Sequence, residues 1–169
     1  MSPLSCFLGV WAGSVPKSYD FTFDPHRCVV NFDLEPLKAP KPLRFGMPKD
    51  EVIRILGNPD KQFIRNPAVG FEELAYDRIG VYVSLDRTSQ CNAVMIFAPS
   101  RAVLDGQDLL KRPAREAIQF IKSKDLDATF ENDSLTAYKL GLSVYAPELQ
   151  EDSQTPIKHV LVFSKEYYG

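Results

Sequence analysis

Residues 43–60 read LRFGMPKDEVIRILGNPD and predict one short helix with a defined beginning and end. Pro48 suits the start of a helix, where its missing N–H has no intrahelical partner to lose. Gly57 suits the left-handed residue that ends a helix, and Pro59 prevents continuation. The apolar side chains form one stripe at helical spacing: Val52, Ile53, Ile55 and Leu56. A helix this short is not stable alone in water, so we expect it to pack against the strands that follow.

The same stretch carries a longer pattern, in which Phe45-Gly46-Met47 precedes Glu51-Val52, Leu56-Gly57 and Pro59. This pattern resembles the F-G-M-[ST]-x-x-[EQ]-V-x-x-x-L-G-x-P signature of the β-lactamase inhibitor protein fold and of the small SmpA/OmlA outer-membrane assembly lipoproteins. Similar helix-and-strand units occur in bacterial toxin-immunity proteins. The chain departs from the signature at Pro48, where the family has Ser or Thr. The capping box is therefore lost, and Glu51 has no hydroxyl partner there.

Alternating apolar and polar residues predict three strands after this helix, at 71–76, 80–85 and 92–97. A weaker copy of the same order follows about 65 residues later. Residues 113–121 align with 48–56, and further strand patterns occur at 137–138, 141–145 and 160–163. The second copy lacks Gly-Met before its helix and Gly-x-Pro after it, and chance similarity between two α+β halves remains the alternative. The sequence thus predicts an α+β protein in which two tandem helix–strand–strand–strand units form one antiparallel sheet with the helices on one face.

The segment before the helix predicts a β-hairpin, with strands at 17–24 and 27–34. Residues 35–42 contain three prolines, so we expect a linker there and not a strand inside a sheet. Within one compact domain, the predicted parts are the hairpin and linker at 1–42, the first unit at 43–100 and the second, degenerate unit at 101–169.

Composition excludes several classes of protein. The 169 residues are 44% hydrophobic and 25% charged, which is typical of a soluble globular protein. A net charge of −2 gives no basic field for nucleic acid, and no stretch has transmembrane length, so we predict neither a nucleic-acid nor a membrane partner. The three cysteines, Cys6, Cys28 and Cys91, are odd in number and widely spaced, which favours a reducing cytoplasm. Residues 1–11 lack the basic start of an export signal.

The sequence predicts no enzyme, and therefore no catalytic residue, metal site or cofactor. Neither of the two histidines, His26 and His159, has metal-ligand spacing to Cys, His or a carboxylate. Phosphate loops, nucleophile elbows and dinucleotide fingerprints are missing from the sequence. A nucleophile at Cys91 would need a histidine brought to it by the fold. The paired aspartates suit turns and helix caps better than acid–base chemistry: Asp20, Asp24, Asp105 and Asp108.

Strand alternation predicts an aromatic sheet face opposite the helices. The residues proposed to bind a partner on this face are Tyr82, Met95, Phe97, Tyr145 and Phe163, with Glu73 and Asp77 as an acidic rim. A free sheet face is expected to be polar, so such rings indicate a partner surface. The alternative is that the N-terminal hairpin covers part of the face through its own aromatic residues: Tyr19, Phe21 and Phe23.

The family resemblance implies a protein that binds and inhibits another protein, because the β-lactamase inhibitor protein grips its target with an open sheet face. In a reducing cytoplasm we expect an immunity protein that neutralises a cognate bacterial toxin. One alternative is an envelope assembly component, which needs an export signal and a lipidated cysteine, with Cys6 as the only candidate. Another is a small hydrolase or nuclease, which needs His26 or His159 beside carboxylates. Neither the identity of the partner nor the oligomeric state follows from the sequence.

Overall fold

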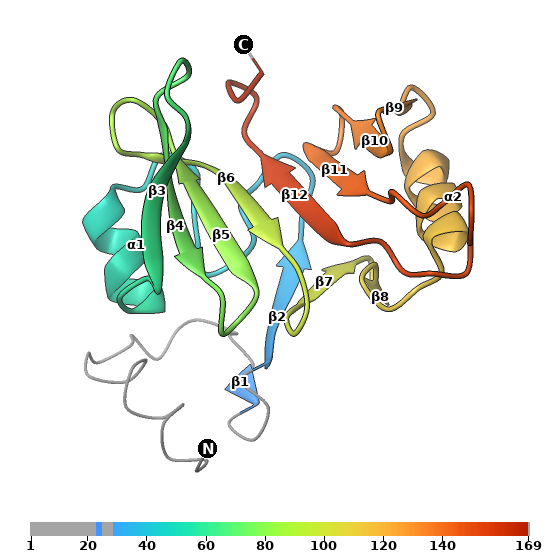
Figure 1. The fold of residues 1–169 in the computed structure, drawn as a ribbon, viewed down its shortest axis with the longest axis horizontal. Helices are drawn as coiled ribbons and strands as arrows, with labels where there is room; N and C mark the ends of the chain where they lie inside the picture. The colour runs from blue at the N-terminus through green and yellow to red at the C-terminus, as the bar shows by residue number, and fades with distance from the viewer. Residues whose placement is uncertain (1–22, 25–28, 169) are drawn as a thin grey trace.

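The computed structural model describes residues 23–24 and 29–168 (Figure 1). These residues form a mostly sheet α+β protein with two helices. The larger sheet has eight antiparallel strands in the order β3-β4-β5-β6-β12-β11-β10-β9. A smaller sheet has the order β1-β2-β7-β8.

The first half of the large sheet follows helix α1 and the second half follows helix α2. The first half consists of α1 (Lys49–Leu56), β3 (Lys61–Asn66), β4 (Phe71–Tyr76), β5 (Val81–Leu85) and β6 (Cys91–Ile96). The second half consists of α2 (Ala114–Lys124), β9 (Thr129–Glu131), β10 (Ser134–Ala137), β11 (Leu142–Tyr145) and β12 (His159–Phe163). The small sheet consists of β1 (Phe23–Asp24), β2 (Val29–Leu34), β7 (Arg101–Leu104) and β8 (Gln107–Asp108).

Helix α1 confirms the predicted helix. Pro48 occupies the capping position just before it and gives no side-chain cap, as expected for a capping box that has lost its hydroxyl. Glu51 instead forms an ion pair with Arg44. Gly57 ends the helix with a φ of 82°, and its N–H donates to the carbonyl of Ile53 at 2.8 Å.

Most of the strand predictions are correct in position, but they are incomplete in number, and β10 shares only Ala137 with the segment predicted at 137–138. Strands β4, β5 and β6 lie within one residue of the predicted segments. Each half nevertheless has four strands after its helix and not three, because the sequence pattern missed β3 and β9. All six residues of β3 are exposed, and its apolar residues Phe63 and Ile64 are adjacent, so period-two alternation is missing there.

The halves meet at an antiparallel pairing of β6 with β12, in which Met95 lies opposite Leu161. Consequently, the centre of the sheet is made from the last strand of each half, and its two edges are β3 and β9. Figure 1 shows this central pair in yellow-green and red.

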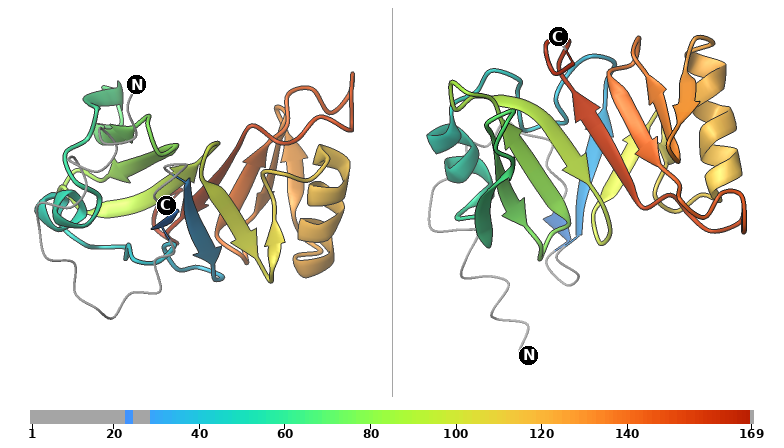
Figure 2. Two further views of the ribbon diagram at one scale, coloured as in Figure 1. Left: turned by 90° about the horizontal axis from the view of Figure 1, so that it is seen from below. Right: turned by 45° about the horizontal axis from the view of Figure 1, so that its top comes forward.

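One face of the large sheet is covered by both helices and by strand β2 of the small sheet (Figures 1 and 2). We call it the covered face. Its strand residues are fully or almost fully buried: Leu74, Val81, Val83, Val94, Ile96, Leu135, Leu142, Val144, Val160 and Val162. The helices add Val52, Leu56, Ala117 and Ile121 to the same cluster. We call the opposite side the open face.

The predicted hairpin is present in part and packs on the covered side. Strand β1 pairs antiparallel with β2, with Phe23 opposite Val30. Of the aromatic residues proposed to cover the open face, Tyr19 and Phe21 lie outside the described residues, as does the side chain of Phe23. Strand β2 buries Phe32 in the cluster of the covered face and pairs in parallel with β7, a contact that the sequence did not predict.

Candidate functional site

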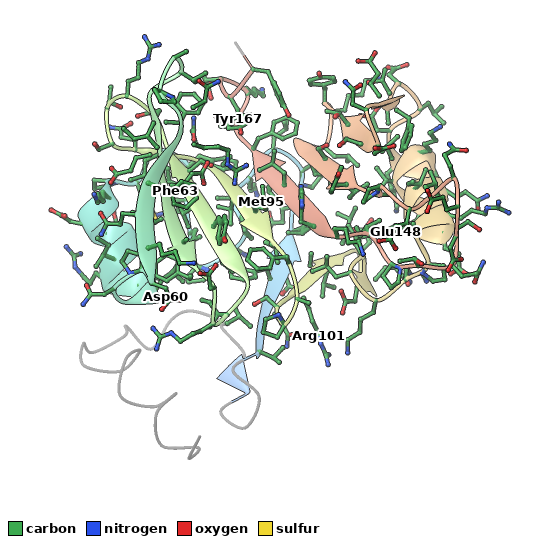
Figure 3. The ribbon with its side chains drawn as sticks, in the orientation of Figure 1. Asp60, Phe63, Met95, Arg101, Glu148 and Tyr167 are labelled. Carbon is green, nitrogen blue, oxygen red and sulfur yellow. The ribbon has the colours of Figure 1, made fainter. Side chains whose placement is uncertain are left out.

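The open face of the first half carries a row of three aromatic rings. Tyr82 on β5 lies between Phe63 on β3 and Phe97, the residue after β6. Its ring centroid is 6.2 Å from that of Phe63 and 5.0 Å from that of Phe97, both edge to face. Phe63 is 39% exposed, and Tyr82, Phe97 and neighbouring Met95 are half-buried. Figure 3 shows Phe63 and Met95 on the side turned toward the viewer.

The second half contributes a stacked pair to the open face. Tyr145 on β11 stacks on His159 on β12, with centroids 5.2 Å apart and ring planes 24° apart. Both side chains are half-buried. Burial lowers the pKa of His159 below its ordinary value, and the positive charge of Arg65 acts in the same direction. This histidine therefore favours the neutral imidazole and offers a flat ring.

Phe163 is buried beneath the C-terminal turn, which corrects its predicted role as an exposed contact. Tyr167 stacks on Phe163 at 5.9 Å, and Tyr168 packs edge-on against it at 4.9 Å. Tyr167 also lies 5.8 Å from Phe71 on β4. Only 3% of Phe163 remains exposed. Among the described residues, this turn covers part of the open face.

Glu73 is also buried, so it does not form the predicted exposed rim. The Ser84 hydroxyl donates a 2.7 Å hydrogen bond to Glu73 Oε1. The guanidinium Nε of Arg65 lies 3.7 Å from the same oxygen. Within the described part of the chain, Oε2 has no hydrogen-bond partner. Burial raises the pKa of Glu73, while the Ser84 hydrogen bond and Arg65 oppose that rise.

Asp77 is the acidic residue that does lie at the rim, just after β4. The Tyr82 hydroxyl donates to Asp77 Oδ1 at 2.7 Å, and the Lys61 ammonium lies 3.0 Å from Oδ2. The Tyr82 hydrogen bond, followed by that of Lys61, lowers the pKa of the Asp77 carboxyl. Asp77 therefore fixes the ring of Tyr82, and Lys61 offsets its charge.

Of the seven predicted residues, the structure brings Tyr82, Met95, Phe97 and Asp77 together on the first half of the sheet. Tyr145 lies across the β6–β12 seam. Four further residues lie on or against this face without having been predicted there: Phe63, Arg65, His159 and Tyr167. The first two lie on the unpredicted β3. For His159, the period-two pattern of β12 was the available signal, since it lies two residues from Leu161 on the same face.

The other chemistry-bearing residues are engaged in structure. Burial raises the pKa of the Cys91 thiol to about 12, so it is a poor source of thiolate. Asp105 pairs with Lys124 at 2.8 Å, and Asp108 accepts the Leu110 N–H at 3.1 Å. Searched over the described residues, the structure contains no group of three or more His, Cys, Asp or Glu side chains arranged to hold a metal ion. Asp20 and His26 lie outside those residues, as does the side chain of Asp24.

Neither helix in the described part of the chain is both long and apolar enough to cross a membrane. Comparison of the chain with protein-family models, with curated proteins and with solved structures gave no match.

Proposed function

We propose that this chain is a protein-binding inhibitor, and in particular a cytoplasmic immunity protein that neutralises a cognate bacterial toxin by direct binding. The observation that carries the proposal is the aromatic character of the open face. Phe63, Tyr82, Phe97 and Tyr145 lie partly exposed on the part of this sheet side that the described elements leave accessible. Tyrosine and other aromatic side chains supply much of the binding energy at protein interfaces.

We also propose that the two halves are tandem units, as the repeated sequence pattern predicts. Equivalent contacts tie each helix to the loop before the last strand of its half. The Lys49 N–H at the start of α1 donates to the Ser89 carbonyl at 3.0 Å. The Ala114 N–H at the start of α2 donates to the Thr155 carbonyl, also at 3.0 Å. This correspondence supports duplication over chance similarity.

A second correspondence involves the turns before β5 and β11. The Phe97 N–H donates to the Gly80 carbonyl at 2.9 Å, and the Phe163 N–H donates to the Gly141 carbonyl at 2.8 Å. Both glycines have positive φ, 71° and 66°. A Cβ would approach the carbonyl oxygen of Phe97 to 2.2 Å at Gly80 and that of Phe163 to 2.9 Å at Gly141. Each half thus uses glycine at the same point for the same close approach.

Duplication bears on binding because it joins two small sheets into one wide face. Met95 and Leu161 lie opposite each other where the halves meet, so the apolar surface continues across the seam. The resemblance of residues 45–59 to the β-lactamase inhibitor protein signature supports the same conclusion, since that family grips an enzyme with an open sheet face.

The experiment is to purify the products of the genes adjacent to this one and to measure whether the chain binds one and abolishes its toxic activity. The informative variant is Tyr82→Ala combined with Tyr145→Ala. Its control is Leu126→Ala, since Leu126 is 88% exposed beyond the end of α2. We expect the double tyrosine variant to lose inhibition while the control keeps it. Equal inhibition by both variants would contradict the proposed face.

A further inference from the structure

The open face contains one carboxylate whose hydrogen-bonding capacity is only partly used. Glu73 lies in the middle of β4, opposite Phe63 on β3 and Ser84 on β5. The residue is 3% exposed. Its Oε1 accepts the Ser84 hydroxyl, and Oε2 has no hydrogen-bond partner among the described residues. An ionised carboxylate can accept about four hydrogen bonds, so several acceptor positions are unfilled.

Packing alone does not explain a carboxylate at this position. Leaving a buried polar group without a hydrogen-bond partner destabilises a fold, and more so when the group is charged. The neighbouring positions on the same face, Ala75 and Ala93, are small and fully buried. A small uncharged residue would suit this row of the sheet equally well. The Glu73 carboxylate therefore needs a hydrogen-bond donor for Oε2 that the described residues do not supply.

Arg65 supplies positive charge at Glu73 but not good hydrogen-bond geometry. Its Nε lies 3.7 Å from Oε1, which is beyond hydrogen-bonding distance, and its side chain is 46% exposed. Burial raises the pKa of Glu73 and Tyr167, the Asp77 hydrogen bond and burial raise that of Tyr82, and the charge of Arg65 opposes each rise. At His159 the charge of Arg65 adds to the lowering of the pKa caused by burial. The guanidinium charge thus acts on groups of both halves, since Tyr82 lies on β5 and His159 on β12.

Two aromatic residues, Phe63 and Tyr167, lie near the same carboxylate. Phe63 lies directly opposite Glu73 on β3, and Tyr167 feels the charge of Glu73 in addition to the larger effect of burial on its pKa. Ring faces attract cations, and a planar guanidinium can stack on a ring while it donates two parallel hydrogen bonds to a carboxylate. A lysine ammonium is not planar, so it cannot stack on a ring and donate two parallel hydrogen bonds to the carboxylate at the same time.

We propose that Glu73 is a receptor for the guanidinium of an arginine side chain carried by the bound protein. This inference rests on the proposed function, since the arginine belongs to the partner. The incoming guanidinium donates to Oε2 and to the remaining acceptor position of Oε1. The incoming group displaces Arg65 toward solvent, because the Arg65–Glu73 distance is long and the Arg65 side chain is already about half exposed.

The test uses N-acetyl-arginine methylamide as the probe and N-acetyl-citrulline methylamide as its uncharged isostere. Each is titrated into the full chain at neutral pH while amide chemical shifts are followed by ¹⁵N NMR. We expect saturable shifts at Glu73, Ser84 and Tyr167 with the arginine probe, and at least tenfold weaker binding of the citrulline probe. Equal binding of the two probes overturns the proposal, and this comparison needs no variant.

Three variants, one of them a control, extend the test. Glu73→Gln is expected to abolish binding of the arginine probe. Glu72→Gln is the matched control: Glu72 is adjacent, pairs with Lys49 at 2.6 Å on the other side of the strand, and should leave binding unchanged. Arg65→Ala should tighten binding several-fold, because it removes the competing guanidinium. Unchanged binding by Glu73→Gln, or weaker binding by Arg65→Ala, overturns the proposal.

Failure here is distinguishable from failure of the proposed function. If the arginine probe binds at Glu73 and no adjacent gene product binds the chain, the receptor site is retained and the inhibitor proposal fails. If a toxin binds through Tyr82 and Tyr145, but the probe does not bind and Glu73→Gln leaves toxin affinity unchanged, the inhibitor proposal is retained and the arginine site fails.

Discussion

The two faces of the large sheet are built from alternate residues of the same strands, yet they differ in chemistry. The covered face is aliphatic and closely packed, as at Val83 and Val94, which are fully buried. The open face presents rings with polar atoms, as at Tyr82 and His159, and these remain half-buried. The period of two thus lets each strand stabilise the fold with one set of side chains and offer a second set for recognition.

The largest expected effect lies on the covered face. Leu56→Ala should lower the free energy of unfolding by about 2–5 kcal/mol, because it leaves a cavity between α1 and the sheet. Leu56 is 4% exposed. Urea denaturation measures the loss, with Leu126→Ala as an exposed control expected to change stability by less than about 0.5 kcal/mol. Equal effects of the two substitutions would show that α1 does not pack as described.

Next in size is the effect of ring removal on the open face. Tyr82→Ala or Tyr145→Ala should weaken partner binding by about 2 kcal/mol or more, with a smaller loss of stability. Asp77→Lys, at the rim, should slow association with a basic partner and also release the Tyr82 ring that Asp77 holds. Melting temperature and binding rates are measured on the same variants. Tyrosine variants with a lower melting temperature but normal binding would show that the open face, like the covered face, stabilises the fold and does not bind the partner.

A third effect, of about 1 kcal/mol, concerns the buried carboxylate of the open face. Burial raises the pKa of Glu73 above its ordinary value of 4.5. The folded protein then binds the proton more tightly than the unfolded chain, so stability falls as pH rises from 4.5 through the folded pKa. Glu73→Gln should raise the melting temperature at pH 7 and change it less at pH 4. An equal shift at both pH values would show that ionisation is not the cause.

The smallest effect is expected at His159. Burial lowers its pKa below 6.5 in the folded protein, so stability is fully present above pH 6.5 and declines as pH falls through the folded pKa. His159→Phe keeps a ring to stack on Tyr145 and removes the titration. Its melting temperature should change less between pH 7 and pH 5 than that of the unchanged protein. Identical pH profiles would show that His159 is not the group responsible.

Local signals explain which parts of the fold were predictable. The ends of α1 follow from Pro48 and Gly57, and the faces of β5 and β6 follow from their alternation. Strand β3 was missed because an edge strand exposed on both sides has no apolar period. The parallel pairing of β2 with β7 was missed because it joins segments far apart in the chain, and no local pattern records such a pairing.

The sequence predicted which side of the sheet carries the candidate site, but not which residues of that side are covered by other parts of the chain. Alternation placed Tyr82, Met95 and Tyr145 on the open side, and their partial exposure agrees with that placement. It also placed Phe163 and Glu73 there, but both are buried. Period two identifies the side toward which a residue points. It does not reveal that a turn such as the one carrying Tyr167 folds back over that side.

The position of β12 has a consequence for how the chain acquires its structure during synthesis. Among the described strands β12 comes last in sequence order, yet it fills the middle of the sheet beside β6. Until His159–Phe163 leaves the ribosome, β6 presents a row of unpaired backbone groups at an apolar edge, which is the kind of edge that pairs with other chains. The two halves therefore complete their folding together. A nascent chain that ends before β12 is the species most in need of a chaperone.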